Sequence, residues 1–150
     1  MYGRRVPKFH PRIEACGAID ELNAALGLAR ASAADEFLTE CLSPVQKELI
    51  TLMGEVATAT DDLDRYRKDG FERVSVAMTA AIEKRIAELE SGLGSFKGWA
   101  TPGDNPPAAA LDLARCICRR AERRVAELQQ AGEIQNPQVL IYLNRLADWL

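Results

Sequence analysis

The sequence predicts an all-α protein, an antiparallel five-helix bundle of four long helices and a shorter C-terminal one, on three observations. Apolar residues recur at alternating spacings of three and four, the period of a helix that packs along one side. Hydrophobic residues make up 47% of the 150 positions and aromatic residues only 6%, which is typical of aliphatic helical cores. No segment shows strand-like alternation of polar and apolar residues. A chain of this length fits one domain, which we expect to span residues 1–150.

Charge and cysteine content exclude several classes of function. The net charge is −3 at pH 7, so the chain lacks a broad basic field for nucleic acid, and its clustered arginines suit a small anionic ligand better. No apolar run approaches the roughly 20 residues that span a membrane, and no secretory signal is evident. One histidine and four cysteines without a CxxC pair do not form a zinc pattern. We therefore expect free thiols in a cytoplasmic protein that binds neither nucleic acid nor membrane.

Three helices are predicted in the first two thirds of the chain. The first spans residues 11–31. The second is predicted to begin at Ser43. Ser43 at the cap, Pro44 at the first helical position and Gln46 at the third have the form of a capping box. Residues 61–70, DDLDRYRKDG, are interpreted as a charged loop or frayed helix. The third helix spans residues 74–93, and its core candidates are Val76, Met78, Ala80, Ile82, Ile86 and Leu89.

The chain is organised around a fourth predicted helix, residues 105–131, which is rich in arginine. Asp104 or Asn105 is available as its N-cap, and two prolines follow at positions where a helix tolerates them. Its apolar seam consists of Leu111, Ala114, Cys118, Ala121, Val125 and Leu128. Such a seam is typical of a helix in the interior of a bundle.

Helical geometry divides the charged residues of this helix into two groups. Arg120, Arg124 and Glu127 lie far from the apolar seam and are interpreted as a solvated face. The other group consists of Glu122, Arg115, Arg119, Asp112 and Arg123, of which Arg115 and Glu122 border the seam and are expected to be partly buried. Buried charges are costly unless they are paired or hold a ligand. The second group is therefore the candidate functional site.

Other candidate residues each allow two interpretations. Asp20, in the first helix, is either a surface carboxylate or the partner of a buried arginine. Lys8 belongs to a basic N-terminal arm that is either solvated or part of an anion site. In the loop over residues 96–107, Trp99 and the Pro102–Gly103 turn either pin the loop to the bundle or form a wall for a cofactor.

The last helix is predicted to begin at Asn136, as cap, and to run to the C-terminus. Arg145 and Asp148 are spaced three residues apart, so their side chains can form an ion pair. Asn144 lies one turn before Asp148. An ordinary surface ion pair is the alternative to a role in the site.

Three separate segments resemble one family, in order. The first signature comprises residues 5–8, RVPK, and residues 12–23, RIEACGAIDELN. The central signature is residues 113–125, LARCICRRAERRV, and the last is residues 142–148, YLNRLAD. Together they reach over nearly the whole chain. These segments resemble the PduO-type ATP:cob(I)alamin adenosyltransferases.

The resemblance implies a homotrimer of five-helix bundles, with ATP bound at each subunit interface. It implies that the Co(I) nucleophile of reduced cobalamin attacks the 5′ carbon of ATP, which gives adenosylcobalamin and triphosphate. ATP, Mg²⁺ and cobalamin are then the expected ligands, with cobalamin as a substrate. A reductase and an adenosylcobalamin-dependent enzyme are the candidate partners.

The resemblance also implies roles for individual residues. The implied ATP site consists of Lys8, Arg119, Arg120, Glu122, Arg123 and Asn144. The implied catalytic residues are Arg119, Asp20 and Arg115, with Asp20 and Arg115 paired across the subunit interface. Trp99, Pro102 and Gly103 would line the cobalamin site. Arg145 and Asp148 would form an ion pair that holds the last helix in place.

The chain departs from the family pattern at several positions. Members usually carry an N-terminal threonine- and glycine-rich loop that wraps the ATP phosphates, and it has no counterpart in residues 1–10. Trp99 stands where the family has phenylalanine, Asp104 where it has the second glycine of a pair, and Asp112 where it has histidine. The expectation is either a working adenosyltransferase seen as a fragment, or a relative that binds nucleotide or cobalamin without turnover. A bundle whose charges serve only subunit contacts is a third hypothesis.

Overall fold

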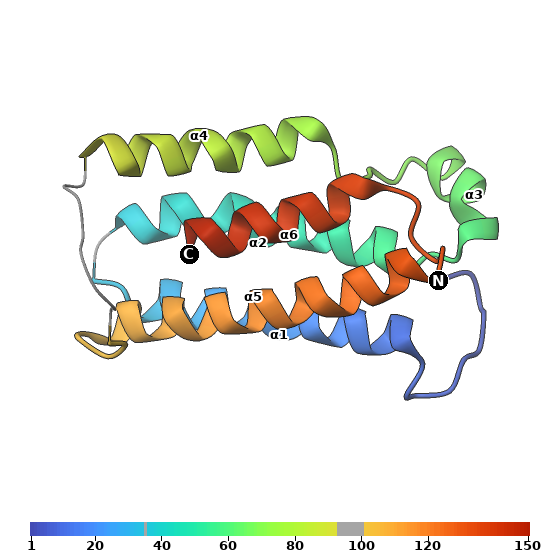
Figure 1. The fold of residues 1–150 in the computed structure, drawn as a ribbon, viewed down its shortest axis with the longest axis horizontal. Helices are drawn as coiled ribbons and strands as arrows, with labels where there is room; N and C mark the ends of the chain where they lie inside the picture. Colours follow the sequence, from blue (N-terminus) through green and yellow to red (C-terminus); the bar gives the residue numbers. More distant parts are fainter. Residues whose placement is uncertain (35, 93–100) are drawn as a thin grey trace.

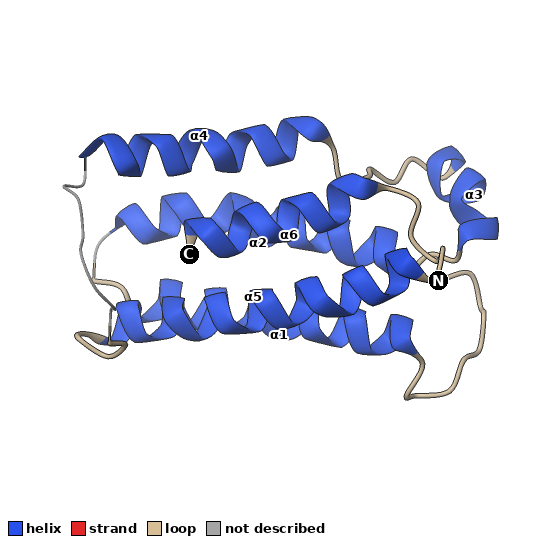
Figure 2. Cartoon of the chain, in the orientation of Figure 1, coloured by secondary structure: helices blue, strands red, loops and turns tan. Residues whose placement is uncertain are grey.

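The computed structural model describes residues 1–34, 36–92 and 101–150, and within these ranges it contains helices and no strand (Figures 1 and 2). The elements are α1 (Pro11–Ser32), α2 (Glu36–Val56), the 3₁₀ turn η1 (Thr60–Asp62), α3 (Leu63–Lys68), α4 (Val76–Gly92), α5 (Pro106–Gln130) and α6 (Pro137–Trp149). Five longer helices run along a common direction, and the short α3 lies at one end of the bundle (Figure 1). The predicted all-α bundle is confirmed, with α3 added. No helix in the described ranges is long and apolar enough to cross a membrane.

Three of the helices begin at residues whose side chains cap them, and two of these caps are the ones that the sequence predicts. The Asn105 side chain accepts a hydrogen bond from the Ala108 N–H at 2.9 Å, so Asn105 and not Asp104 caps α5. Asn136 caps α6 in the same way, through the Gln138 N–H at 3.1 Å. At α1 the cap is His10, which was not predicted. Each cap satisfies a backbone donor that the helix itself leaves unpaired.

The prediction that the second helix begins at Ser43 is wrong, because α2 begins at Glu36 and contains Pro44 in its interior. Apolar spacing continues N-terminal to the proline: Leu42 is fully buried and Leu38 packs against the core. This burial outweighs the one backbone hydrogen bond that an internal proline removes. The Ser43 hydroxyl accepts instead from the Arg30 guanidinium at 2.9 Å.

Residues 61–70 are more ordered than a loop, since most of them lie in η1 and α3 and Tyr66 is buried. The core prediction for the next helix holds only in part. Ile82 is fully buried in α4, whereas Val76 is 67% exposed and Leu89 is 39% exposed. The reason is that α6 is the main packing partner of α4, and a single neighbouring helix covers only a narrow side of α4.

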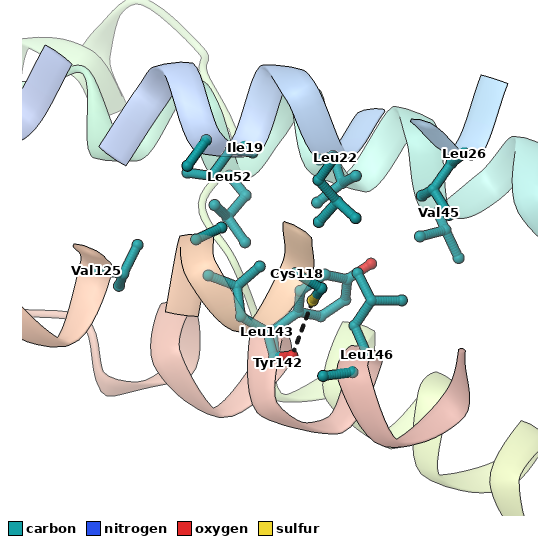
Figure 3. Packing of buried hydrophobic residues seen from close by; sticks show 14 of the residues in the cluster. Ile19, Leu22, Leu26, Val45, Leu52, Cys118, Val125, Tyr142, Leu143 and Leu146 are labelled. Atoms are coloured by element: carbon teal, nitrogen blue, oxygen red, sulfur yellow. Dashed lines mark hydrogen bonds between the residues drawn. The ribbon is translucent and has the colours of Figure 1, made fainter. Parts of the chain in front are cut away.

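The core lies between α1, α2, α5 and α6 (Figure 3). Its largest fully buried side chains on these helices are Ile19, Leu22, Leu26, Leu42, Val45, Leu49, Leu52, Leu128, Tyr142, Leu143 and Leu146. Helices α1 and α5 meet through small side chains, among them Ala15, Ala18, Ala114 and Ala121. Small residues allow the two backbones to approach closely, and these two helices carry most of the charged residues of the candidate site.

The amino end of α1 lies beside the carboxyl end of α5 (Figure 1). The Arg12 guanidinium donates from Nη2 to the Glu133 carbonyl at 2.9 Å, just beyond α5. The N-terminal arm is held at the same end, where Arg4 pairs with Asp62 at 2.5 Å. Lys8 follows in this arm, so it also belongs to this end of the bundle.

Candidate functional site

Three charged residues of α5 surround a shallow pocket of about 250 Å³ on the α5–α6 face. Its lining consists of Arg119, Glu122, Arg123, Ala126 and Leu140. Arg119 and Arg123 are exposed and lie one helical turn apart, while Glu122, closer to the apolar seam, is half-buried. Like charges at this spacing destabilise a helix by roughly 0.2–0.5 kcal/mol. The arrangement is thus suited to an anion that lies against both guanidinium groups.

The other arginines of α5 have carboxylate partners within the chain, whereas Arg119 and Arg123 form no ion pair in the part that the structure describes. Arg124 lies 3.3 Å from Glu127 on an exposed face. Arg120 forms an ion pair with Glu21 of α1. The solvated face predicted for Arg120 and Arg124 is therefore exposed but paired, and Arg120 also ties α5 to α1.

Arg115 is half-buried, as its place beside the apolar seam predicts, and it pairs with Asp112 at 2.9 Å. The hydrogen bond to Asp112 raises the pKa of the Arg115 guanidinium above its ordinary value. The i,i+3 spacing of the two residues could have predicted the pair from sequence. Asp20 is exposed on α1, and the chain by itself pairs Arg115 with Asp112.

A chain of polar contacts joins α6 to the pocket. The Asn144 side chain donates from Nδ2 to Oε1 of Glu122 at 2.9 Å. The Asn144 carbonyl oxygen Oδ1 accepts from Arg145 Nη2 at 3.0 Å. The same nitrogen lies 3.0 Å from Oδ2 of Asp148. The helix pair therefore brings together four of the residues that the last two signatures indicate.

Lys8 lies apart from this pocket. It is exposed in the arm that precedes α1, at the end of the bundle where α5 finishes. Arg119 lies about 16 Å from that end of α5, at a helical rise of about 1.5 Å per residue. Within one chain, then, Lys8 is not brought to the arginine pocket.

The residues expected to line a cobalamin site lie in or beside the loop before α5. Trp99 is outside the described residues. Pro102 and Gly103 are exposed. Gly103 has φ +118, a backbone conformation that disfavours any side chain, so this position requires glycine. The aspartate that replaces the family's second glycine is the following residue, Asp104.

Cys118 is fully buried where α5 packs onto α6 (Figure 3). Its thiol donates to the Leu143 carbonyl oxygen at 3.3 Å, one residue before Asn144. Burial, with a smaller effect of the Glu122 carboxylate, raises the thiol pKa from 9.0 to about 12. Cys118 is therefore a neutral packing residue, in contrast to Cys116, which is exposed.

Sequence reasoning missed a buried contact that supports α6 from the opposite side. The Tyr142 hydroxyl donates to Oε2 of Glu48 on α2 at 2.6 Å. Burial, followed by this hydrogen bond, raises the pKa of Tyr142 above its ordinary value. No local spacing could have indicated the pair, since 94 residues separate its members.

A helical bundle that places two neighbouring arginines beside a carboxylate and an amide has the side-chain chemistry that a polyanionic ligand requires. Comparison with known proteins makes the class specific. The family model described as cobalamin adenosyltransferase matches residues 1–150, and the chain belongs to this family.

Similar proteins include the corrinoid adenosyltransferase PduO of Salmonella typhimurium, 43% identical over 150 residues. That alignment covers 99% of this chain but 43% of the relative, so the chain spans less than half the length of that protein. The corrinoid adenosyltransferase of Bacillus subtilis is 37% identical over 153 residues, which cover 99% of this chain and 75% of the relative.

Solved structures agree with the fold. A phenylalanine-to-histidine variant of a PduO-type ATP:corrinoid adenosyltransferase from Lactobacillus reuteri, complexed with cobalamin and ATP, superposes with a TM-score of 0.86. It is 31% identical, and the match covers 98% of this chain and 78% of that one. An arginine-to-lysine variant of the enzyme from the same organism, complexed with ATP, also gives a TM-score of 0.86 at 30% identity, covering 99% of this chain and 82% of that one.

Proposed function

We propose that this chain transfers the 5′-deoxyadenosyl group of ATP to cob(I)alamin, which yields adenosylcobalamin and triphosphate. Membership of the family and the names of its relatives support the reaction. The observation that carries it is the pair Arg119 and Arg123, unpaired within the described chain and facing one pocket with Glu122. Two like charges one helical turn apart cost a helix roughly 0.2–0.5 kcal/mol, and an anion that contacts both guanidinium groups would offset this cost.

The proposed reaction requires groups that bind ATP and stabilise the leaving triphosphate. The electron pair of Co(I) forms the bond to the 5′ carbon of ATP, the bond from that carbon to the triphosphate oxygen breaks, and triphosphate leaves with its negative charge. Fixed cations lower the cost of that developing charge. Arg119 and Lys8 are proposed to hold the triphosphate. Arg120 is also proposed to contact ATP, in exchange for its ion pair with Glu21 of α1. Glu122, Arg123 and Asn144 are proposed to complete the nucleotide site.

Cobalamin is proposed to approach from the loop before α5, where Trp99, Pro102 and Gly103 would form an apolar wall. Since the cobalt supplies the nucleophile, these residues would position it and exclude water. Mg²⁺ is proposed to accompany ATP through the phosphate oxygens, as it commonly does. A reductase that supplies cob(I)alamin and an enzyme that consumes adenosylcobalamin are the proposed partners. The four free cysteines support a cytoplasmic location.

The site is proposed to be completed across subunits of a homotrimer. The separation of Lys8 from the arginine pocket within one chain supports this, because a second copy could bring its own Lys8 to Arg119. Asp20 of one copy would pair with Arg115 of another, in competition with Asp112. The variants Asp20→Arg and Arg115→Asp should each weaken the trimer in analytical ultracentrifugation, and the double variant should restore it. Unchanged sedimentation of both single variants would exclude this pair as a trimer contact.

The test of the reaction combines the full-length protein with ATP, Mg²⁺ and chemically reduced cobalamin, and follows the adenosylcobalamin spectrum and triphosphate release. Both products in equal amounts are expected. Binding of ATP without either product would favour the relative that binds without turnover. If the folded protein neither binds ATP nor forms product, the result would favour the third hypothesis, a bundle whose charges serve only subunit contacts.

A further inference from the structure

The side-chain amide of Asn144 has one orientation, and two charged neighbours select it. Its Nδ2 faces the Glu122 carboxylate at 2.9 Å, and its Oδ1 faces the Arg145 guanidinium at 3.0 Å. The two ends of an amide are nearly equal in shape and differ only in whether they donate or accept. A flipped amide would place N–H groups against Arg145 and an oxygen against Glu122. Both contacts would then be repulsive.

Arg145 is itself held in place. Its Nη2 lies between Asn144 Oδ1 and Asp148 Oδ2, at 3.0 Å from each. All three residues lie within two turns of α6, so the helix backbone sets their spacing. The contacts form one chain between two carboxylates: the Arg145 guanidinium donates to Asp148 and to Asn144, and the Asn144 amide donates to Glu122 on α5.

We infer that Arg145 is a positioning residue: it fixes the Asn144 amide so that Asn144 holds one oxygen of Glu122 and leaves the other directed at the pocket ligand. The inference rests on the proposed nucleotide site. Glu122 lines the pocket together with Arg119 and Arg123, and Asn144 engages only its Oε1 among the described residues. Once a ligand draws on Glu122, Arg145 is the remaining group that keeps the amide from rotating. Arg145 thus acts on the ligand through Asn144, without touching it.

The chain offers a matched control for the ion pair as such. Arg124 and Glu127 form an i,i+3 pair on α5, with side chains 48% and 57% exposed, against 40% and 41% for Arg145 and Asp148. Arg124 donates to Glu127 but makes no contact with an amide of the site. Replacement of either arginine by methionine keeps an unbranched side chain of similar reach and removes the donors.

A double-mutant cycle on ATP affinity tests the inference. Arg145→Met should weaken ATP binding about three- to tenfold, the effect of one lost hydrogen bond. In an Asn144→Ala background the same change should have less than about a twofold effect, because its target is gone. Arg124→Met should also change affinity less than about twofold. An equal loss from Arg145→Met in both backgrounds would overturn the inference.

A second measurement does not depend on ATP. The side-chain amide signal of Asn144, assigned in ¹H–¹⁵N spectra by its loss in Asn144→Ala, should shift in Arg145→Met and not in Arg124→Met. An unchanged signal in Arg145→Met would overturn the inference even if the protein bound no ATP, whereas absence of ATP binding with a shifted signal would count against the proposed function alone. If Arg145→Met does not fold, Arg145→Leu, which also lacks a donor, takes its place in both experiments with the same expected outcomes.

Discussion

The Arg12 guanidinium donates a hydrogen bond from Nη1 to the backbone carbonyl of Val56 at 2.7 Å, across 44 residues of sequence. The same nitrogen reaches the Thr58 carbonyl at 2.9 Å, and Nη2 contacts the backbone and side chain of Glu133. Arg12 is buried. One side chain therefore satisfies carbonyls at the end of α2 and joins them to α1 and to the connection between α5 and α6.

Replacement of Arg12 by methionine is expected to destabilise the protein by about 2–4 kcal/mol, because it leaves buried carbonyls without donors. Urea unfolding followed by circular dichroism measures the change. The control is Arg67→Met, which removes an exposed i,i+3 pair with Asp64 and should cost less than about 1 kcal/mol. Equal effects of the two variants would contradict a structural role for the Arg12 contacts.

Gly54 is expected to tolerate no side chain. A Cβ atom at this position would lie 2.6 Å from the hydroxyl oxygen of Tyr66, which is buried and stacked on Phe71. Gly54→Ala should therefore destabilise the protein by about 1–3 kcal/mol, although alanine is the better helix former. The double variant Gly54→Ala with Tyr66→Phe removes the clashing oxygen and should recover part of the loss in thermal unfolding. No recovery would show that the close approach is not the cause.

The thiols are expected to differ in reactivity. Cys116 is exposed, so iodoacetamide at pH 8 should label it first, whereas buried Cys118, with its thiol pKa raised to about 12, should react only on unfolding. Peptide mass spectrometry at increasing urea separates the two sites. Labelling of Cys118 before the unfolding transition would contradict its place in the core.

The same thiol predicts a loss of stability in alkali. The pKa of the Cys118 thiol in the folded state lies above the ordinary value of 9.0. The contribution of this thiol to the free energy of unfolding is therefore complete below pH 9 and is lost as the pH rises towards 12. The slope from this one group is at most about 1.4 kcal/mol per pH unit. Free energies of unfolding measured from pH 8 to pH 10.5 should fall less steeply for Cys118→Ala than for the unaltered protein. Parallel curves would contradict the prediction.

Arg119 is expected to carry a larger share of ATP binding than any arginine outside the pocket. Arg119→Ala should raise the ATP dissociation constant by about one to two orders of magnitude, the effect of losing a charge-assisted phosphate contact of about 1.5–3 kcal/mol. Isothermal titration calorimetry with MgATP measures it, with Arg124→Ala as the matched change on the exposed face. Equal affinity of the Arg119 variant and the unaltered protein would favour a charged face that serves only subunit contacts.

Local patterns predicted α5 closely, because the cap, the first-turn prolines and the apolar seam all lie in one continuous segment. The half-buried positions of Arg115 and Glu122 followed from the same seam. The start of α2 was predicted wrongly, since a capping box at Ser43 also fits the interior of a longer helix whose Leu42 is buried. The buried side of α4 was predicted only in part, because its width depends on how many neighbours cover it.

The amino-acid sequence by itself determined the helical class, the central arginine-rich helix and, through three signatures, the family. These properties depend on spacing along the chain, which sequence displays directly. Only the tertiary structure decided that Asn144 meets Glu122, that Glu21 meets Arg120, and that Lys8 lies far from the pocket within one chain. Such relations depend on the register between helices, which is set by the packing of buried side chains from distant segments.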